Sequence, residues 1–288
     1  MNTMSKTTKN YKDTVFSSLF YECENAEDNA RSLYKALTGK NVEEIEKCRL
    51  EEVLFREFKN DVAYIMDGKW VCFIEHQSTI NPNMPLRLFI YAARTYERFI
   101  TSDLIYSYNL VNVPKPEFYV LYNGKNKLEN SKLMLSNSFL DNTGDMTAEI
   151  NVRILDINYN RMDNQLKNCH ALSDYAFLVD RVRNNNGNME KAIRECIDNN
   201  VLKDYLTFYG SEVINMLFEE YNAEKALEIR GKEEYEKGRA EGEITGEEKG
   251  KAKMIQLFYQ AEKNIKKISD TFKIPETEVR RLLALNVK

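Results

Sequence analysis

The chain has few of the residues that build zinc sites or disulfide frameworks. It contains two histidines and five cysteines among 288 residues, and no two cysteines have the C-x-x-C spacing of a zinc or redox site. The cysteines are scattered and odd in number, so we expect reduced, partly buried thiols. The sequence therefore argues against a structural zinc site and against a disulfide-stabilised fold.

Long apolar runs and a net positive charge are also lacking. Without an apolar run long enough to span a bilayer, or a secretory signal pattern, we expect a cytoplasmic protein with no membrane partner. The net charge of −4 provides no overall attraction to nucleic acid, so binding to DNA would need local basic patches. Hydrophobic residues make up 43% of the chain, enough to form the core of one large or two small domains.

Residues 61–78 contain the most informative pattern that is present. Asp67-Gly68 is a strong hairpin signal between two runs rich in apolar, aromatic and β-branched residues. The second run, from Trp70 to Ile74, is almost continuously apolar, as in a strand buried on both faces. Glu75 at its end then needs a compensating positive charge, and a bound divalent cation is the usual one.

The register of this hairpin decides whether Asp61, Glu75 and Gln77 share one face. Side chains alternate faces with a period of two, so a two-residue loop would pair Asp61 with Ile74 and separate the two acids. We predict an odd-length loop, with Met66-Asp67-Gly68 as the turn and Gly68 in the left-handed conformation. The alternative is that Asp61 is a polar residue at a strand edge and Glu75 a salt-bridged strand terminus.

Four segments occur in the order of a known family: Asn60-Asp61-Val62, Glu75-His-Gln-Ser78, Asn83-Met-Pro-Leu-Arg87 with Tyr91, and Phe118-Tyr-Val-Leu-Tyr-Asn-Gly124. From about Lys12 to about Tyr221, the chain resembles the recombination-promoting nuclease (Rpn) and putative transposase family. That family belongs to the PD-(D/E)xK nuclease superfamily. The resemblance implies an α/β fold with a mixed sheet flanked by helices, and Mg²⁺-dependent cleavage of DNA. It also implies that Asp61 and Glu75 hold the metal.

Gln77 stands where the superfamily most often has lysine, and the family that the chain resembles shares this glutamine. An amide can orient the attacking water but brings no positive charge, so a nearby cation must help to stabilise the transition state. Arg87 is our candidate, because Arg87, Tyr91, Arg94 and Arg98 fall on one helical face and arginine can hold a phosphate with two hydrogen bonds. The alternative for these arginines is a solvated basic face.

Two other sets of residues near the site have separate interpretations. His76 faces away from Glu75 and Gln77 in a strand, so we interpret it as a packing histidine and not as a base. In the superfamily an acidic residue of the first helix often completes the site, and Asp13, Glu22 and Glu24 all remain open as that residue.

The chain divides by pattern into an α/β core and a helical C-terminal region. We expect a nuclease core with three or four strands over residues 1–165 and a helical extension over residues 166–221. Residues 131–147 are expected to be loop, and the state of residues 42–58 is left open.

Residues 222–250 are rich in Glu, Lys and Gly, with Gly238, Gly242, Gly246 and Gly250 spaced by four. They form either a linker or a helical seam between copies. Residues 251–288 resemble a small helix-turn-helix unit with its turn at Lys273-Ile-Pro275. One interpretation is a helical pair that packs within the chain or mediates oligomerisation. The other is that the unit binds DNA through its second helix.

The leading hypothesis is a Mg²⁺-dependent DNA endonuclease with low sequence specificity, linked to recombination or mobile elements. The alternative is a catalytically silent protein with the nuclease fold, which binds nucleic acid or forms homo-oligomers through its C-terminal helices. RNA is a third possible substrate, although no aromatic stacking platform in the sequence favours it.

Overall fold

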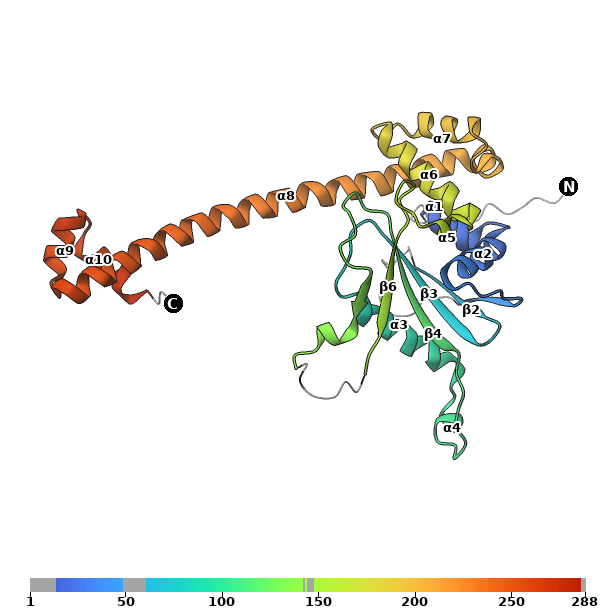
Figure 1. The fold of residues 1–288 in the computed structure, drawn as a ribbon, viewed down its shortest axis with the longest axis horizontal. Helices are drawn as coiled ribbons and strands as arrows, with labels where there is room; N and C mark the ends of the chain where they lie inside the picture. The colour runs from blue at the N-terminus through green and yellow to red at the C-terminus, as the bar shows by residue number, and fades with distance from the viewer. Residues whose placement is uncertain (1–13, 49–60, 142, 144–147, 286–288) are drawn as a thin grey trace. The chain divides into compact units, whose positions relative to one another are not determined.

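The computed structural model describes residues 14–48, 61–141, 143 and 148–285, which form an α/β protein. The chain splits into two compact units, Met1–Asn222 and Ala223–Lys288. The first unit contains the whole sheet, and the second is helical (Figure 1). No helix that the structure describes has both the length and the apolar character needed to cross a bilayer.

A six-stranded mixed sheet forms the centre of the first unit, with the strand order β1-β2-β3-β4-β6-β5. Its strands are β1 (Ile45–Cys48), β2 (Asp61–Met66), β3 (Trp70–Gln77), β4 (Lys115–Tyr122), β5 (Lys132–Met134) and β6 (Asn151–Asp156). Strands β3, β4 and β6 are parallel, and the other pairings are antiparallel. The carboxyl ends of three neighbouring strands therefore meet at one edge, where open α/β sheets usually bind their ligands.

The expectation of three or four strands was wrong because the two outermost strands are short. β1 lies in the segment whose state was left open, and β5 lies in the segment expected to be loop. Edge strands are paired and packed on fewer sides, so their sequences carry little of the apolar alternation by which strands are recognised. The 3₁₀ turn η2 (Leu135–Ser138) follows β5 directly.

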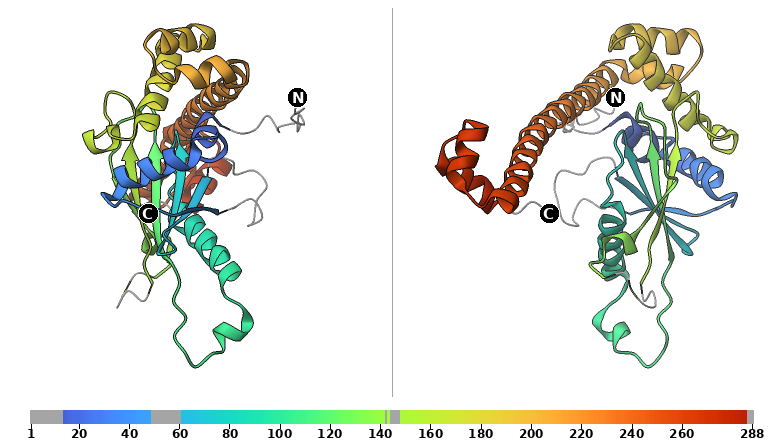
Figure 2. Two further views of the ribbon diagram at one scale, coloured as in Figure 1. Left: turned by 90° about the vertical axis from the view of Figure 1, so that its right-hand side faces the viewer. Right: turned by 60° about the vertical axis from the view of Figure 1, so that its left-hand side comes forward.

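Helices cover both faces of the sheet. On one face, a cluster that includes Val62, Tyr64, Cys72 and Ile74 packs with the N-terminal helices, the helices that follow β6 and the beginning of α8. On the other face, Ala63, Val71, Phe73 and Val120 pack against α3. Figure 2 shows α2 and α3 on opposite sides of the strands.

The helices have the following bounds: α1 (Val15–Ser17), the π-helical η1 (Ser18–Glu22), α2 (Ala26–Thr38), α3 (Met84–Phe99), α4 (Ser102–Ile105), α5 (Asn164–Lys167), α6 (His170–Asn184), α7 (Met189–Asp198), α8 (Lys203–Glu262), α9 (Ile265–Phe272) and α10 (Glu276–Ala284).

The second unit has a small core of its own. Ala252 and Ile255 of α8 pack with Ile268 of α9 and with Val279 and Leu282 of α10. The turn between α9 and α10 lies at the predicted residues, and Lys273 has a φ of +52° there. Residues 222–250 are helical as part of α8, and a Cβ added at any of the four regularly spaced glycines would meet nothing within 4 Å.

Candidate functional site

The β2–β3 hairpin has the odd register that the sequence predicts. Met66 pairs with Trp70, which leaves Asp67, Gly68 and Lys69 as a three-residue connection, and Asp61 pairs with Glu75. Asp67 and Gly68 have φ values of +50° and +61°, and the N–H of Lys69 donates to the carbonyl of Met66. The connection is therefore residues 67–69 and not residues 66–68, because two consecutive left-handed residues close the turn after Met66.

This register puts the positions of Asp61, Glu75 and Gln77 on the sheet face that α3 covers. Residues directly opposite in an antiparallel pair share a face, and Glu75 alternates in step with Val71 and Phe73 of the α3-side cluster. The side chain of Asp61 itself lies outside the described part of the structure. The two acids are thus neighbours by backbone pairing, as the site hypothesis requires.

Glu75 is a buried carboxylate with only 2% of its surface exposed. The Nη2 atom of Arg87 lies 2.7 Å from its Oε1, and Gln77 Nε2 donates to its Oε2 at 2.9 Å. Arg87 therefore supplies the positive charge that the sequence analysis had assigned to a metal ion. In this respect Glu75 matches the alternative interpretation of a salt-bridged strand terminus.

Arg87 reaches Glu75 because α3 begins directly after the turn that follows β3. Pro85 lies in the first turn of α3, where a missing N–H costs nothing, and Arg87 follows within that turn. Its Nη2 also donates to the Tyr91 hydroxyl at 3.2 Å, and its guanidinium lies 5.9 Å from the centre of that ring. Arg94 is exposed and ion-paired with Glu97. Arg87 and Arg94 of the predicted basic face therefore have different partners.

Gln77 connects the carboxylate to the start of α3. Its Nε2 lies 2.9 Å from the sulfur of Met84, and its Oε1 accepts from the N–H of Asn81 at 3.5 Å. The amide thus has a fixed direction, with its nitrogen on Glu75. Met84 and Asn81 were not identified as site residues from the sequence. Their contacts depend on how residues 78–83 connect the end of β3 to the start of α3.

The other candidates lie elsewhere in the structure. Asp13 lies outside the described residues. Glu22 and Glu24 are exposed, and the turn that carries Glu22 packs through Leu19 and Phe20 on the sheet face away from α3. The structure therefore does not bring Glu22 or Glu24 to Glu75.

His76 occupies the opposite face from Glu75, as predicted for a packing histidine. Its ring stacks on Phe16 with centroids 5.0 Å apart, and its Nε2 shares a hydrogen bond with the Tyr175 hydroxyl at 3.1 Å. Burial, with a smaller effect from the charge of Arg183, lowers the pKa of His76 from 6.5 to about 3. The imidazole is therefore neutral at physiological pH.

We expect this buried histidine to make the fold sensitive to acid. Its pKa is lower in the folded than in the unfolded chain, so its contribution to stability is fully present above pH 6.5 and is lost as the pH falls towards 3. Between pH 7 and pH 5 the loss is about 2 kcal/mol. Urea unfolding at both pH values is expected to show a smaller loss in a His76→Phe variant.

The matched control for that experiment is His170→Gln, because His170 is the other histidine and is exposed. It is expected to keep the full acid sensitivity of the wild-type chain. Equal pH dependence in the wild type and in His76→Phe would show that the buried imidazole is not responsible.

Glu75 is the described carboxylate at this site, and carboxylate oxygen is a ligand type that Mg²⁺ prefers. Mg²⁺ needs one or two carboxylates because it keeps several of its waters. Among the side chains that the structure describes, no three His, Cys, Asp or Glu residues gather as a metal-binding group. A cation here would therefore depend on Glu75 and Asp61.

Comparisons of this chain with models of protein families, with curated proteins and with solved structures find no match.

Proposed function

We propose that the chain is a divalent-metal-dependent nuclease that hydrolyses phosphodiester bonds in DNA with low sequence specificity. The observation that supports this best is the pairing of Asp61 with Glu75, with Gln77 two residues further along the same strand and face. The three positions lie at the edge where β3 and β4 end. The resemblance to the recombination-promoting nucleases adds a role in recombination or with mobile elements.

Each residue of the site has a defined task in this proposal. Asp61 and Glu75 hold the cation, which when bound supplies an activated water and offsets charge on the scissile phosphate. Gln77 donates to Glu75 and so holds the carboxylate in one orientation. Arg87 holds the other carboxylate oxygen and provides the positive charge that a lysine at position 77 would have brought.

The direct test is incubation of the full-length protein with supercoiled plasmid DNA and Mg²⁺, with EDTA as the matched control. We expect conversion to nicked and linear DNA with Mg²⁺ and none with EDTA. Cleavage that is equal in both samples, or absent from both over a range of divalent cations, would contradict the proposal.

A second candidate function is a catalytically silent nuclease fold that binds nucleic acid or assembles. The specific observation in its favour is that both oxygens of Glu75 already have protein partners, one of them cationic. In this case Arg87 provides the positive charge beside Glu75 in place of a metal. The C-terminal helices mediate self-association. Gel shift and light-scattering mass measurements would then show DNA binding or oligomers without any cleavage.

A further inference from the structure

A long arm, residues 101–114, extends from the first unit between α3 and β4. Figures 1 and 2 show it reaching past the end of the strands, with α4 close to its tip. Every side chain from residue 101 to residue 110 is exposed. The arm begins after the end of α3 and returns at the start of β4, whereas Gln77 and Tyr122 pair at the other ends of β3 and β4. It therefore lies at the opposite end of the sheet from the candidate nuclease site.

The arm carries a dense group of large apolar side chains that the chain itself does not cover. They are Leu104, Ile105, Tyr106, Tyr108, Leu110 and Val113. Tyr106 is 85% exposed, Leu110 is 87% exposed, and Tyr108 is fully exposed. Single exposed apolar residues are ordinary on a protein surface, but a contiguous group of them marks an interaction site.

The absence of charge along the arm decides which kind of partner fits it. The sequence has no charged residue between Asp103 and Lys115. Nucleic acid is bound mainly by Lys and Arg that neutralise its phosphates, so the arm does not suit DNA or RNA. Segments that lie on a membrane surface also carry basic residues on their polar side. The arm therefore fits the surface of a protein.

The backbone of the returning part of the arm is also available for pairing. Residues 107–114 belong to no helix or strand. The N–H groups of Tyr108, Leu110 and Val113 have no hydrogen-bond partner within the described part of the chain. Such groups would be costly to place in lipid hydrocarbon, where nothing satisfies them. Against a protein they can pair with the backbone of another segment.

The exposed area of the arm matches what a stable protein contact needs. An aromatic side chain removes roughly 150–250 Å² from water when it is fully buried, so Tyr106 and Tyr108 at their exposures offer about 300–450 Å². The aliphatic side chains of the arm raise this to roughly the 800 Å² that each partner contributes to a standard interface. Two arms packed together therefore offer enough surface for a specific contact.

We propose that the arm is the contact surface of a two-fold dimer, in which the arm of one copy packs against the arm of a second copy. A two-fold interface uses the same patch on both subunits, so that patch must not repel itself. An uncharged apolar arm meets this requirement. A different protein would be selected by a complementary charge pattern, which the arm does not have. Because the contact lies at the opposite end of the sheet, it leaves Glu75 and Gln77 uncovered.

The first test is the mass of the full-length protein in solution, measured by light scattering over a wide range of concentration. We expect the wild type to have the mass of two chains. The variant Tyr106→Ser/Tyr108→Ser/Leu110→Ser is expected to weaken dimerisation at least about 100-fold, because buried tyrosines are typical hot spots of interfaces. The matched control is Tyr235→Ser/Ile244→Ser, which removes exposed apolar side chains from α8 in the second unit. It is expected to keep the mass of two chains.

A pair of charge variants tests whether the arm meets its own copy. Tyr106→Lys/Tyr108→Lys and Tyr106→Glu/Tyr108→Glu are each expected to be monomeric, because like charges meet across the two-fold axis. An equal mixture of the two is expected to regain the mass of two chains.

The proposal would be overturned by a monomeric wild type, by a dimer that survives the arm substitutions, or by a mixture of the charge variants that stays monomeric. A monomeric wild type that binds phosphatidylcholine vesicles would also overturn it, and would identify a lipid surface as the partner. The mass is measured without DNA or Mg²⁺, so the outcome is separate from whether the chain cleaves DNA.

Discussion

Replacement of Glu75 by glutamine is expected to lower Mg²⁺-dependent cleavage of plasmid DNA at least about 100-fold, since loss of even an outer partner of a metal ligand costs 10–100-fold. Glutamine has the same shape and can still accept from Arg87, but it has lost the charge that a metal requires. Asp61→Asn is expected to have an effect of the same order, because its position pairs directly with Glu75. Initial rates of plasmid nicking at fixed Mg²⁺ measure both effects.

The control for Glu75→Gln is Glu117→Gln. Glu117 is also a strand carboxylate in an ion pair, 3.0 Å from Lys40, but it lies near the start of β4 and away from the candidate site. This variant is expected to keep wild-type cleavage, which separates loss of the site from loss of a strand ion pair. Unchanged rates in both Glu75→Gln and Asp61→Asn, with far-UV circular dichroism showing folded protein, would refute the metal site.

The arrangement of the acids could be predicted from the sequence because it depends on local rules. Asp67-Gly68 is a turn signal. Because side chains alternate between the two faces of a strand, the number of residues in the turn decides which residues of the two strands share a face. The position of the turn was wrong by one residue, yet the odd count was right. The shared face of the two acids follows from that count, whereas the direct pairing of Asp61 with Glu75 depends on the turn lying at residues 67–69.

The ion pair between Arg87 and Glu75 could not be predicted in the same way. Helical spacing showed which residues share a face with Arg87, but the direction of that face depends on how the 78–83 turn places α3 on the sheet. In the structure Arg87 points at Glu75, while Arg94 on the same helix pairs with Glu97. Whether Arg87 also contacts a phosphate stays a prediction.

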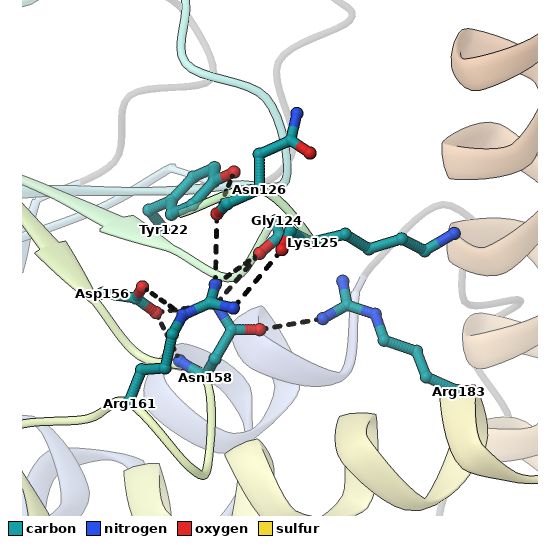
Figure 3. A network of polar contacts seen from close by, with 8 residues as sticks. All are labelled: Tyr122, Gly124, Lys125, Asn126, Asp156, Asn158, Arg161 and Arg183. Carbon is teal, nitrogen blue, oxygen red and sulfur yellow. Dashed lines mark hydrogen bonds and ion pairs between the residues drawn. The ribbon is translucent and has the colours of Figure 1, made fainter. Parts of the chain in front are cut away.

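A cavity of about 210 Å³ lies between the loops after β4 and β6 and helix α6, and it could not be predicted from the sequence either. Lys125, Arg161 and Arg183 come from two loops and a helix (Figure 3), and none belongs to a recognisable motif. Clusters assembled from distant segments leave no periodic pattern, so only the folded chain reveals them.

Arg87→Met is expected to lower the free energy of unfolding by about 3–5 kcal/mol, the usual cost of removing one partner from a buried ion pair. The Glu75 side chain is 3% exposed and would lose the guanidinium that lies 2.7 Å from its Oε1. Methionine is a good helix former, so the loss would not come from α3 itself. Urea unfolding with a constant m-value measures the change.

Two further variants test whether this loss of stability comes from the buried Glu75 carboxylate losing its partner. Arg94→Met removes an exposed arginine of the same helix, whose ion pair with Glu97 is worth at most about 1 kcal/mol. The double variant Glu75→Gln/Arg87→Met contains neither charge, so it is expected to be more stable than Arg87→Met alone. If Arg87→Met and Arg94→Met cost the same, or if the double variant is the least stable, then Arg87 does not neutralise Glu75. The carboxylate would in that case need another cation, and the case for a bound metal would become stronger.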